Sequence, residues 1–180
     1  MKIAAVFALV VALLLGMIAG IGWVDGTIGD GSAAAIDAVT GAEQAYVEFV
    51  IARLESAGTN MGNLGYLITN PEFGNTDWKM KVYLVVNQLQ AAFADVADLE
   101  PSERLQPFQD ASVDALSHAA KFGELAEDML AAESTEMSEE AVKELVAANN
   151  AFAEAEELLL EFLEAHPLPD VSEQASGESQ

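Results

Sequence analysis

Cysteine is absent from the 180 residues of this chain, and basic residues are scarce. Without cysteine the chain has no disulfide framework, no thiolate metal site, no cysteine nucleophile and no N-terminal cysteine for lipid attachment. Only 7 lysine and arginine residues stand against 30 aspartate and glutamate residues, which gives a formal net charge of -23. Because phosphate binding needs clustered positive charge, nucleic acid and anionic lipid surfaces are disfavoured as partners.

Recognisable catalytic motifs are also missing. The sequence contains no Gly-x-Ser-x-Gly elbow, no Walker loop and no dinucleotide fingerprint. The two histidines, His118 and His166, follow Ala115 and Leu163 at a distance of three residues, so neither belongs to the Glu-x-x-His motif of di-iron bundles. Asp114 shares a helix face with His118, but such a pair is common by chance. We predict no catalytic residues, no metal site, no cofactor and no enzyme activity.

Strand signals are nearly absent, whereas apolar residues are plentiful. Apolar residues make up 52% of the chain and the mean hydropathy is +0.23, which is too apolar for a disordered acidic chain. The one β-rich run, residues 82–86, also fits helical spacing. The composition predicts a folded helical domain with an acidic surface. Both a salt-adapted protein and an ordinary acidic exported protein have such a surface.

An uncharged apolar run spans residues 3–24, between Lys2 and Asp25. As a helix this run is about 33 Å long, close to the hydrocarbon thickness of a bilayer. Lys2 places the N-terminus in the cytoplasm, and Trp23 suits the outer interface. We predict a single-pass anchor over residues 1–24 with the rest of the chain outside. The alternative is a signal segment that is cleaved, followed by secretion.

Small residues recur every fourth position within this apolar run. If the run is helical, they lie on one face, where small side chains let membrane helices pack closely. This ladder predicts a homo-oligomer or a membrane protein partner, and the alternative is a leader that is merely rich in alanine and glycine. The ladder consists of Ala4, Ala8, Ala12, Gly16 and Gly20.

Beyond the apolar run, the spacing of apolar residues predicts four amphipathic helices. The first extends from Ala33 to Ile68 with a weak point at residues 58–60, and Asn70-Pro71 ends it. The second is capped by Thr76 or Asp77. The third follows the break at residues 100–102, and the last begins at Ser138 and ends near Ala165.

Four such helices with short connections predict an all-α fold, in which the N-terminal transmembrane or signal helix precedes an antiparallel up-down four-helix bundle. The expected domain organisation is an anchor or signal segment at 1–24, a glycine-rich linker at 25–32, an acidic bundle at 33–166 and a disordered acidic tail at 167–180.

The stretch around the first turn of the bundle is the most unusual part of the expected domain. It gathers amide and aromatic side chains, which suit contacts with sugars or peptides. The alternative is a helix end and turn, where asparagine and glycine occur for backbone reasons. The candidate ligand-binding residues are Asn63, Tyr66, Asn70, Phe73 and Trp78.

Three functional hypotheses follow. The first is a membrane-anchored, non-enzymatic binding or scaffolding protein of the cell envelope. The second is a secreted or tethered ligand-binding domain that acts through a partner and resembles the four-helix sensor modules of chemoreceptors and sensor kinases. The third, a secreted hydrolase or metal enzyme, would require His118 to meet several inward-facing carboxylates.

Overall fold

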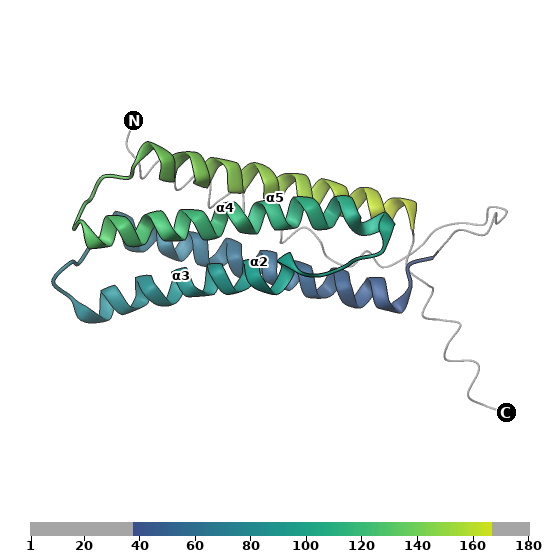
Figure 1. Ribbon diagram of the computed structural model, residues 1–180, viewed down its shortest axis with the longest axis horizontal. Coiled ribbons are helices and arrows are strands. Elements are labelled where there is room, and N and C mark those ends of the chain that lie inside the picture. Colours follow the sequence, from purple (N-terminus) through teal and green to yellow (C-terminus); the bar gives the residue numbers. More distant parts are fainter. Residues whose placement is uncertain (1–37, 167–180) are drawn as a thin grey trace, which may run out of the picture.

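The computed structural model describes residues 38–166, and this part of the chain is a bundle of helices without strands. In Figure 1 consecutive helices run in opposite directions and are joined by short connections at alternating ends. The prediction of an all-helical bundle with four long helices is confirmed. These helices are α2 (Gly41–Thr69), α3 (Thr76–Ala97), α4 (Gln106–Ala131) and α5 (Glu139–Ala165), with a short 3-10 helix η1 (Glu103–Leu105) before α4.

The first helix of the bundle starts later than the sequence predicts. Residues 38–40 are not helical, and α2 begins at Gly41 instead of continuing from Ala33. The cause is a capping box, in which the Thr40 hydroxyl accepts from the Glu43 backbone N–H and the Glu43 carboxylate accepts from the Thr40 backbone N–H. The helix then runs unbroken through residues 58–60, where a weak point was expected.

The other helix ends follow local signals. Asn75, rather than Thr76 or Asp77, caps α3, because its side-chain oxygen accepts from the backbone N–H groups of Asp77 and Trp78. Ser138 caps α5 as predicted, and α5 ends at Ala165.

The α4–α5 connection contains a left-handed residue. Glu133 has φ 47, and the backbone N–H groups of Glu133 and Ser134 donate to the carbonyls of Leu130 and Met129. This is the hydrogen-bond pattern of a Schellman motif, whose left-handed position favours glycine.

The core lies between the four helices, and α4 is at its centre. α4 packs closely against α5, α3 and α2, and α2 packs against α3, whereas α2 and α5 make at most marginal contact. Among the largest fully buried side chains are Phe108 and Phe122 of α4, Leu89 of α3 and Leu64 of α2. The core is therefore centred on α4, and α2 and α5 approach each other less closely than the other neighbouring helices do.

Several predictions fall on residues that lie outside the described range. They are the anchor at 1–24 with its small-residue ladder, the linker at 25–32, the first residues of the predicted bundle at 33–37 and the tail at 167–180. Within residues 38–166, no helix is both long and apolar enough to cross a membrane.

Candidate functional site

The bundle has two ends of different character. One end combines the start of α2, the α3–α4 connection and the end of α5, and we call it the polar end (Figure 1). The opposite end combines the α2–α3 turn and the α4–α5 connection, and we call it the aromatic end. All five ligand-binding candidates from the sequence lie at the aromatic end or beside it.

Two of these candidates meet in the structure. The rings of Phe73 and Trp78 form an edge-to-face pair with centroids 5.5 Å apart and an interplanar angle of 83°. Trp78 is only 7% exposed, so its side chain belongs to the core. Its indole N–H is buried without a hydrogen-bond partner among the described residues.

The other three candidates do not converge on a common point. Asn70 ends α2, where its side-chain amide donates to the Tyr66 backbone carbonyl at 2.9 Å. Asn63 is exposed, and Tyr66 is 70% exposed. Asn70 therefore serves the helix end, and the five residues do not surround a cavity that the structure records.

An exposed apolar surface close to this end was not predicted from the sequence. Met80, Tyr83 and Leu84 of α3 are 63%, 44% and 58% exposed, although all three are large and apolar. Their spacing of three and four residues places them together on the outer face of the helix. We call these three residues the α3 apolar patch. The sequence did contain a signal for this patch. Residues 82–86 are all apolar, so they cover every side of the helix, and two of them, Tyr83 and Leu84, cannot face the core.

The polar end is held by one arginine. Arg104 donates to both carboxylate oxygens of Glu43, from Nε at 2.7 Å and from Nη2 at 2.5 Å. Its Nη2 also donates to the Ala38 carbonyl at 3.2 Å, and its Nη1 lies 3.3 Å from Nδ1 of His166. Ser102 adds a hydroxyl that donates to Glu43 at 2.7 Å.

This cluster changes the chemistry of the buried carboxylate. Glu43 is 7% exposed, and hydrogen bonding to Arg104 holds its pKa well below the usual range, against the opposing effect of burial. The Ser102 and Thr40 hydrogen bonds act in the same direction as Arg104. The hydrogen bonds of the cluster join the start of α2, the α3–α4 connection and the end of α5.

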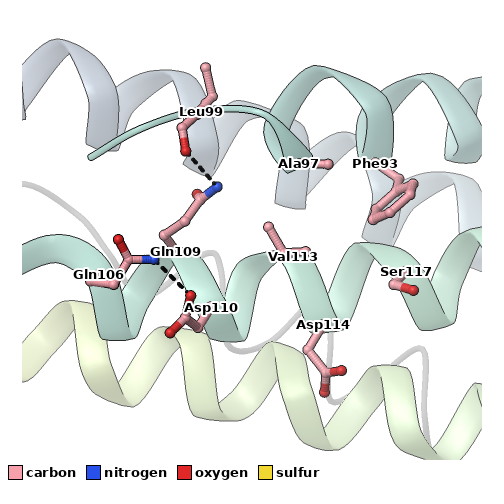
Figure 2. Close-up of a pocket in the computed structure, with 9 residues that line it drawn as sticks. All are labelled: Phe93, Ala97, Leu99, Gln106, Gln109, Asp110, Val113, Asp114 and Ser117. Carbon is pink, nitrogen blue, oxygen red and sulfur yellow. Dashed lines mark hydrogen bonds between the residues drawn. The ribbon is translucent and has the colours of Figure 1, made fainter.

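A groove of about 380 Å³ lies between the end of α3 and the first half of α4 (Figure 2). Its apolar lining comes from Phe93, Ala97, Leu99 and Val113, and its polar lining from Gln106, Gln109, Asp110, Asp114 and Ser117. In Figure 2 Val113 and Gln109 point towards α3, while Asp110 and Asp114 point away from it. The two carboxylates therefore do not face the apolar lining as a pair of catalytic acids would.

Gln109 is a structural member of this groove. It is 3% exposed, and its amide N–H groups donate to the carbonyls of Val96 at 2.7 Å and Leu99 at 3.3 Å. Its side-chain oxygen accepts from the Tyr46 hydroxyl of α2. Burial and the charge of Asp110 raise the pKa of Tyr46 to about 12, so this hydroxyl stays a donor at neutral pH.

The two histidines belong to separate clusters. His118 Nδ1 lies 2.5 Å from the Glu144 carboxylate of α5, and Nε2 lies 3.6 Å from Asp114 on its own helix. His166 instead contacts Arg104 at the polar end. Because the carboxylates sit at opposite ring nitrogens of His118, they do not converge on one point. In the described part of the chain no group of three acidic or histidine side chains could hold a metal ion.

Compared with protein-family models, curated proteins and solved structures, the chain shows no match in any of the three.

Proposed function

We propose that this chain is a non-enzymatic binding protein of the cell envelope. In this proposal residues 1–24 anchor it in the membrane with the N-terminus in the cytoplasm, and the bundle outside binds a partner protein through the α3 apolar patch. The observation that carries the proposal is the patch itself, because three adjacent large apolar side chains are exposed on the surface of a strongly acidic chain.

The geometry of the chain allows the patch to face away from the membrane. Residue 38 enters the bundle at the polar end, and residues 25–37 connect it to the proposed anchor. The α3 apolar patch lies in the half of α3 that is nearest the opposite end. When the polar end lies nearer the membrane, the patch is on the far side of the bundle, where a partner can reach it.

The charge of the chain indicates what kind of partner fits. With a net charge of -23, the chain as a whole attracts a partner that carries basic residues around an apolar contact surface. A second copy of this chain would be repelled, most strongly at low salt.

The first experiment tests the anchor and the patch together. The full-length chain, tagged at its C-terminus, is produced in its native host, fractionated, weighed by mass spectrometry and purified from detergent-solubilised membranes. We expect an uncleaved chain in the membrane fraction that co-purifies with a partner. Leu84→Glu should remove this partner, whereas Ala91→Glu, a change at an exposed site two turns further along α3, should retain it.

Two results would contradict the proposal. A mass that lacks the first 20–33 residues, with protein in the medium, would exclude the anchor and favour secretion. Equal recovery of the partner with Leu84→Glu and with wild type would exclude the α3 apolar patch as the contact.

The second candidate function is ligand binding by the bundle, and the α3–α4 groove favours it. The groove has an apolar lining and polar edges, as small-molecule sites have. Ala97→Trp would fill it. If the groove binds ligands, an uncharged apolar fluorescent dye should bind wild type and not this variant; equal binding by both would exclude the groove.

A further inference from the structure

The gap between α2 and α5 has two flanks that the contacts of the bundle locate. On α2, Arg53 marks the side that faces α3, because its Nε lies 2.8 Å from Asp95. At about 100° per residue, Ile51, Gly58 and Gly62 lie roughly half a turn around the helix from Arg53. Gly58 is buried and Gly62 half-buried. This flank of α2 therefore presents glycine backbone at two positions and one large side chain, that of Ile51.

The flank of α5 is found in the same way. Glu144 marks the side that faces α4, since its carboxylate contacts His118. Val142, Val146 and Leu160 lie roughly half a turn away from it. They are 37%, 44% and 45% exposed, which is unusual for large aliphatic side chains beside a core.

These two flanks would meet if the four helices formed a closed ring, but α2 and α5 make at most marginal contact. We call the gap between them the α2–α5 seam. It is lined by two glycines and Ile51 on the α2 side and by aliphatic side chains on the α5 side. A helix that fits this seam is apolar and carries small residues on the face towards α2.

The chain contains a segment with these properties. We infer that the α2–α5 seam is the docking place of residues 3–24 of the same chain whenever that segment is outside a bilayer. As a helix the segment is about 33 Å long, and the distance along α5 from Val142 to Leu160 is about 27 Å. The small-residue ladder would lie against Gly58 and Gly62, where close approach of two backbones needs small side chains on both.

The connection to the bundle allows this arrangement. Residues 25–37 number 13 and reach about 43 Å when extended. They let residue 24 lie beside the start of α2, so that the docked segment runs antiparallel to α2 and parallel to α5. This inference does not depend on the α3 apolar patch, which is on the outer face of a different helix.

Residues 3–24 thus have two alternative apolar environments, the bilayer and the α2–α5 seam. In water, the segment and the aliphatic flank of α5 would both expose apolar surface, and docking removes both from water at once. Insertion into a membrane empties the seam again.

The absence of cysteine allows a direct test by disulfide trapping. The full-length chain is prepared without detergent or lipid, with Leu160→Cys combined in turn with cysteine at positions 18, 19, 20 and 21. The matched control combines Met80→Cys with the same positions, because Met80 is also exposed and lies on the outer face of α3. We expect mild oxidation to give an intramolecular disulfide in at least one Leu160 pair and in none of the Met80 pairs.

A second variant tests the fit of the seam. Gly62→Leu should lower the yield of the trapped disulfide at least five-fold while the helical circular dichroism is retained, because leucine favours a helix but blocks close approach. The control is Gly41→Ala at a position with open space around it. The inference is overturned if no Leu160 pair forms, if the Met80 pairs form equally well, if the disulfides are intermolecular, or if Gly62→Leu leaves the yield unchanged. None of these outcomes alters the partner test with Leu84→Glu, so the two proposals can fail separately.

Discussion

The polar end and the aromatic end of the bundle join the helices by different interactions. Both must join two pairs of helices, but the polar end does so with the buried Glu43–Arg104 pair, while the aromatic end uses the Phe73–Trp78 pair and a backbone motif around Glu133. At the polar end the polar groups are paired with one another. At the aromatic end the Trp78 indole N–H is buried without a partner among the described residues, and the α3 apolar patch begins nearby.

This difference indicates that the polar end contributes mainly to the stability of the fold, whereas the α3 apolar patch contributes mainly to partner binding. A buried, fully hydrogen-bonded ion pair fixes geometry, and removal of one partner is costly. Exposed apolar side chains add little to the stability of the monomer but supply binding energy when a partner covers them. We therefore expect substitutions at the polar end to change unfolding, and substitutions in the patch to change binding.

The largest change in the free energy of unfolding should come from removing the ion pair between Glu43 and Arg104 at the polar end. Glu43→Gln removes the charge that Arg104 binds and should lower the free energy of unfolding by about 3 kcal/mol at pH 7. Urea unfolding followed by circular dichroism measures this loss. The control is Glu48→Gln, five residues further along α2, because Glu48 is exposed and accepts one hydrogen bond from the half-buried Gln44.

The effect of Glu43→Gln should also depend on pH. Since the pKa of Glu43 is lowered in the folded state, its contribution is present above the ordinary glutamate pKa of about 4.3 and is lost as the pH falls below that value. The difference between wild type and variant should therefore shrink below about pH 4. A difference that stayed constant down to pH 2 would contradict the assignment of the ion pair.

Substitution of Gln109, which also lies near the polar end, should lower the free energy of unfolding by a smaller amount. Gln109→Ala leaves the carbonyl of Val96 and the hydroxyl of Tyr46 without this partner, and should cost about 2 kcal/mol. Gln106→Ala is the control, because Gln106 is exposed and bonds only to Asp110, and its change should stay within about 0.5 kcal/mol. Equal changes for the two variants would show that the buried network of Gln109 contributes nothing.

At the aromatic end one substitution should stabilise the protein. Glu133 occupies a left-handed conformation with φ 47, which glycine adopts without strain. Glu133→Gly should raise the free energy of unfolding by up to about 1 kcal/mol, reduced slightly by loss of the long ion pair to Lys79. Thermal unfolding measures the gain, and Glu136→Gly, at an exposed site in the same connection, should show none.

The smallest effect on stability should be found in the α3 apolar patch. Leu84→Gln should change the free energy of unfolding by less than about 0.5 kcal/mol, because Leu84 is 58% exposed. Leu89→Ala, at a fully buried site on the same helix, should cost about 3 kcal/mol. A large loss for Leu84→Gln would mean that the patch is part of the core and not a binding surface.

The helices could be predicted from the sequence because their signals are local. The 3.6-residue spacing of apolar residues gave four helices, and Asn70-Pro71 and Ser138 marked two of their ends correctly. The start of α2 was missed because the alanine-rich residues before Thr40 favour a helix, while the capping box that stops it depends on the pairing of Thr40 with Glu43. That motif is local and was present in the sequence.

The clusters that join the helices could not be predicted in the same way. Glu43 lies on the apolar face of α2, but nothing near it in the sequence identifies Arg104 as its partner. The α3 apolar patch depends on which side of an all-round apolar stretch faces the core, and this is decided by α2 and α4. The site candidates Asn63, Tyr66, Asn70, Phe73 and Trp78 were chosen by composition, and the structure brings only Phe73 and Trp78 together as side chains.

The position of Arg104 also has a kinetic consequence. Arg104 lies 61 residues from Glu43 and 62 residues from His166 along the chain, and it joins the first and last helices of the bundle through the connection between the middle two. Its contact with Glu43 needs only α2 and the α3–α4 connection, whereas its contact with His166 also needs the end of α5, so the complete cluster requires the whole bundle. An interaction that forms after the rate-limiting step leaves the folding rate almost unchanged and slows unfolding. If the complete cluster forms after the rate-limiting step, substitution of Arg104 should speed unfolding and leave the folding rate almost unchanged.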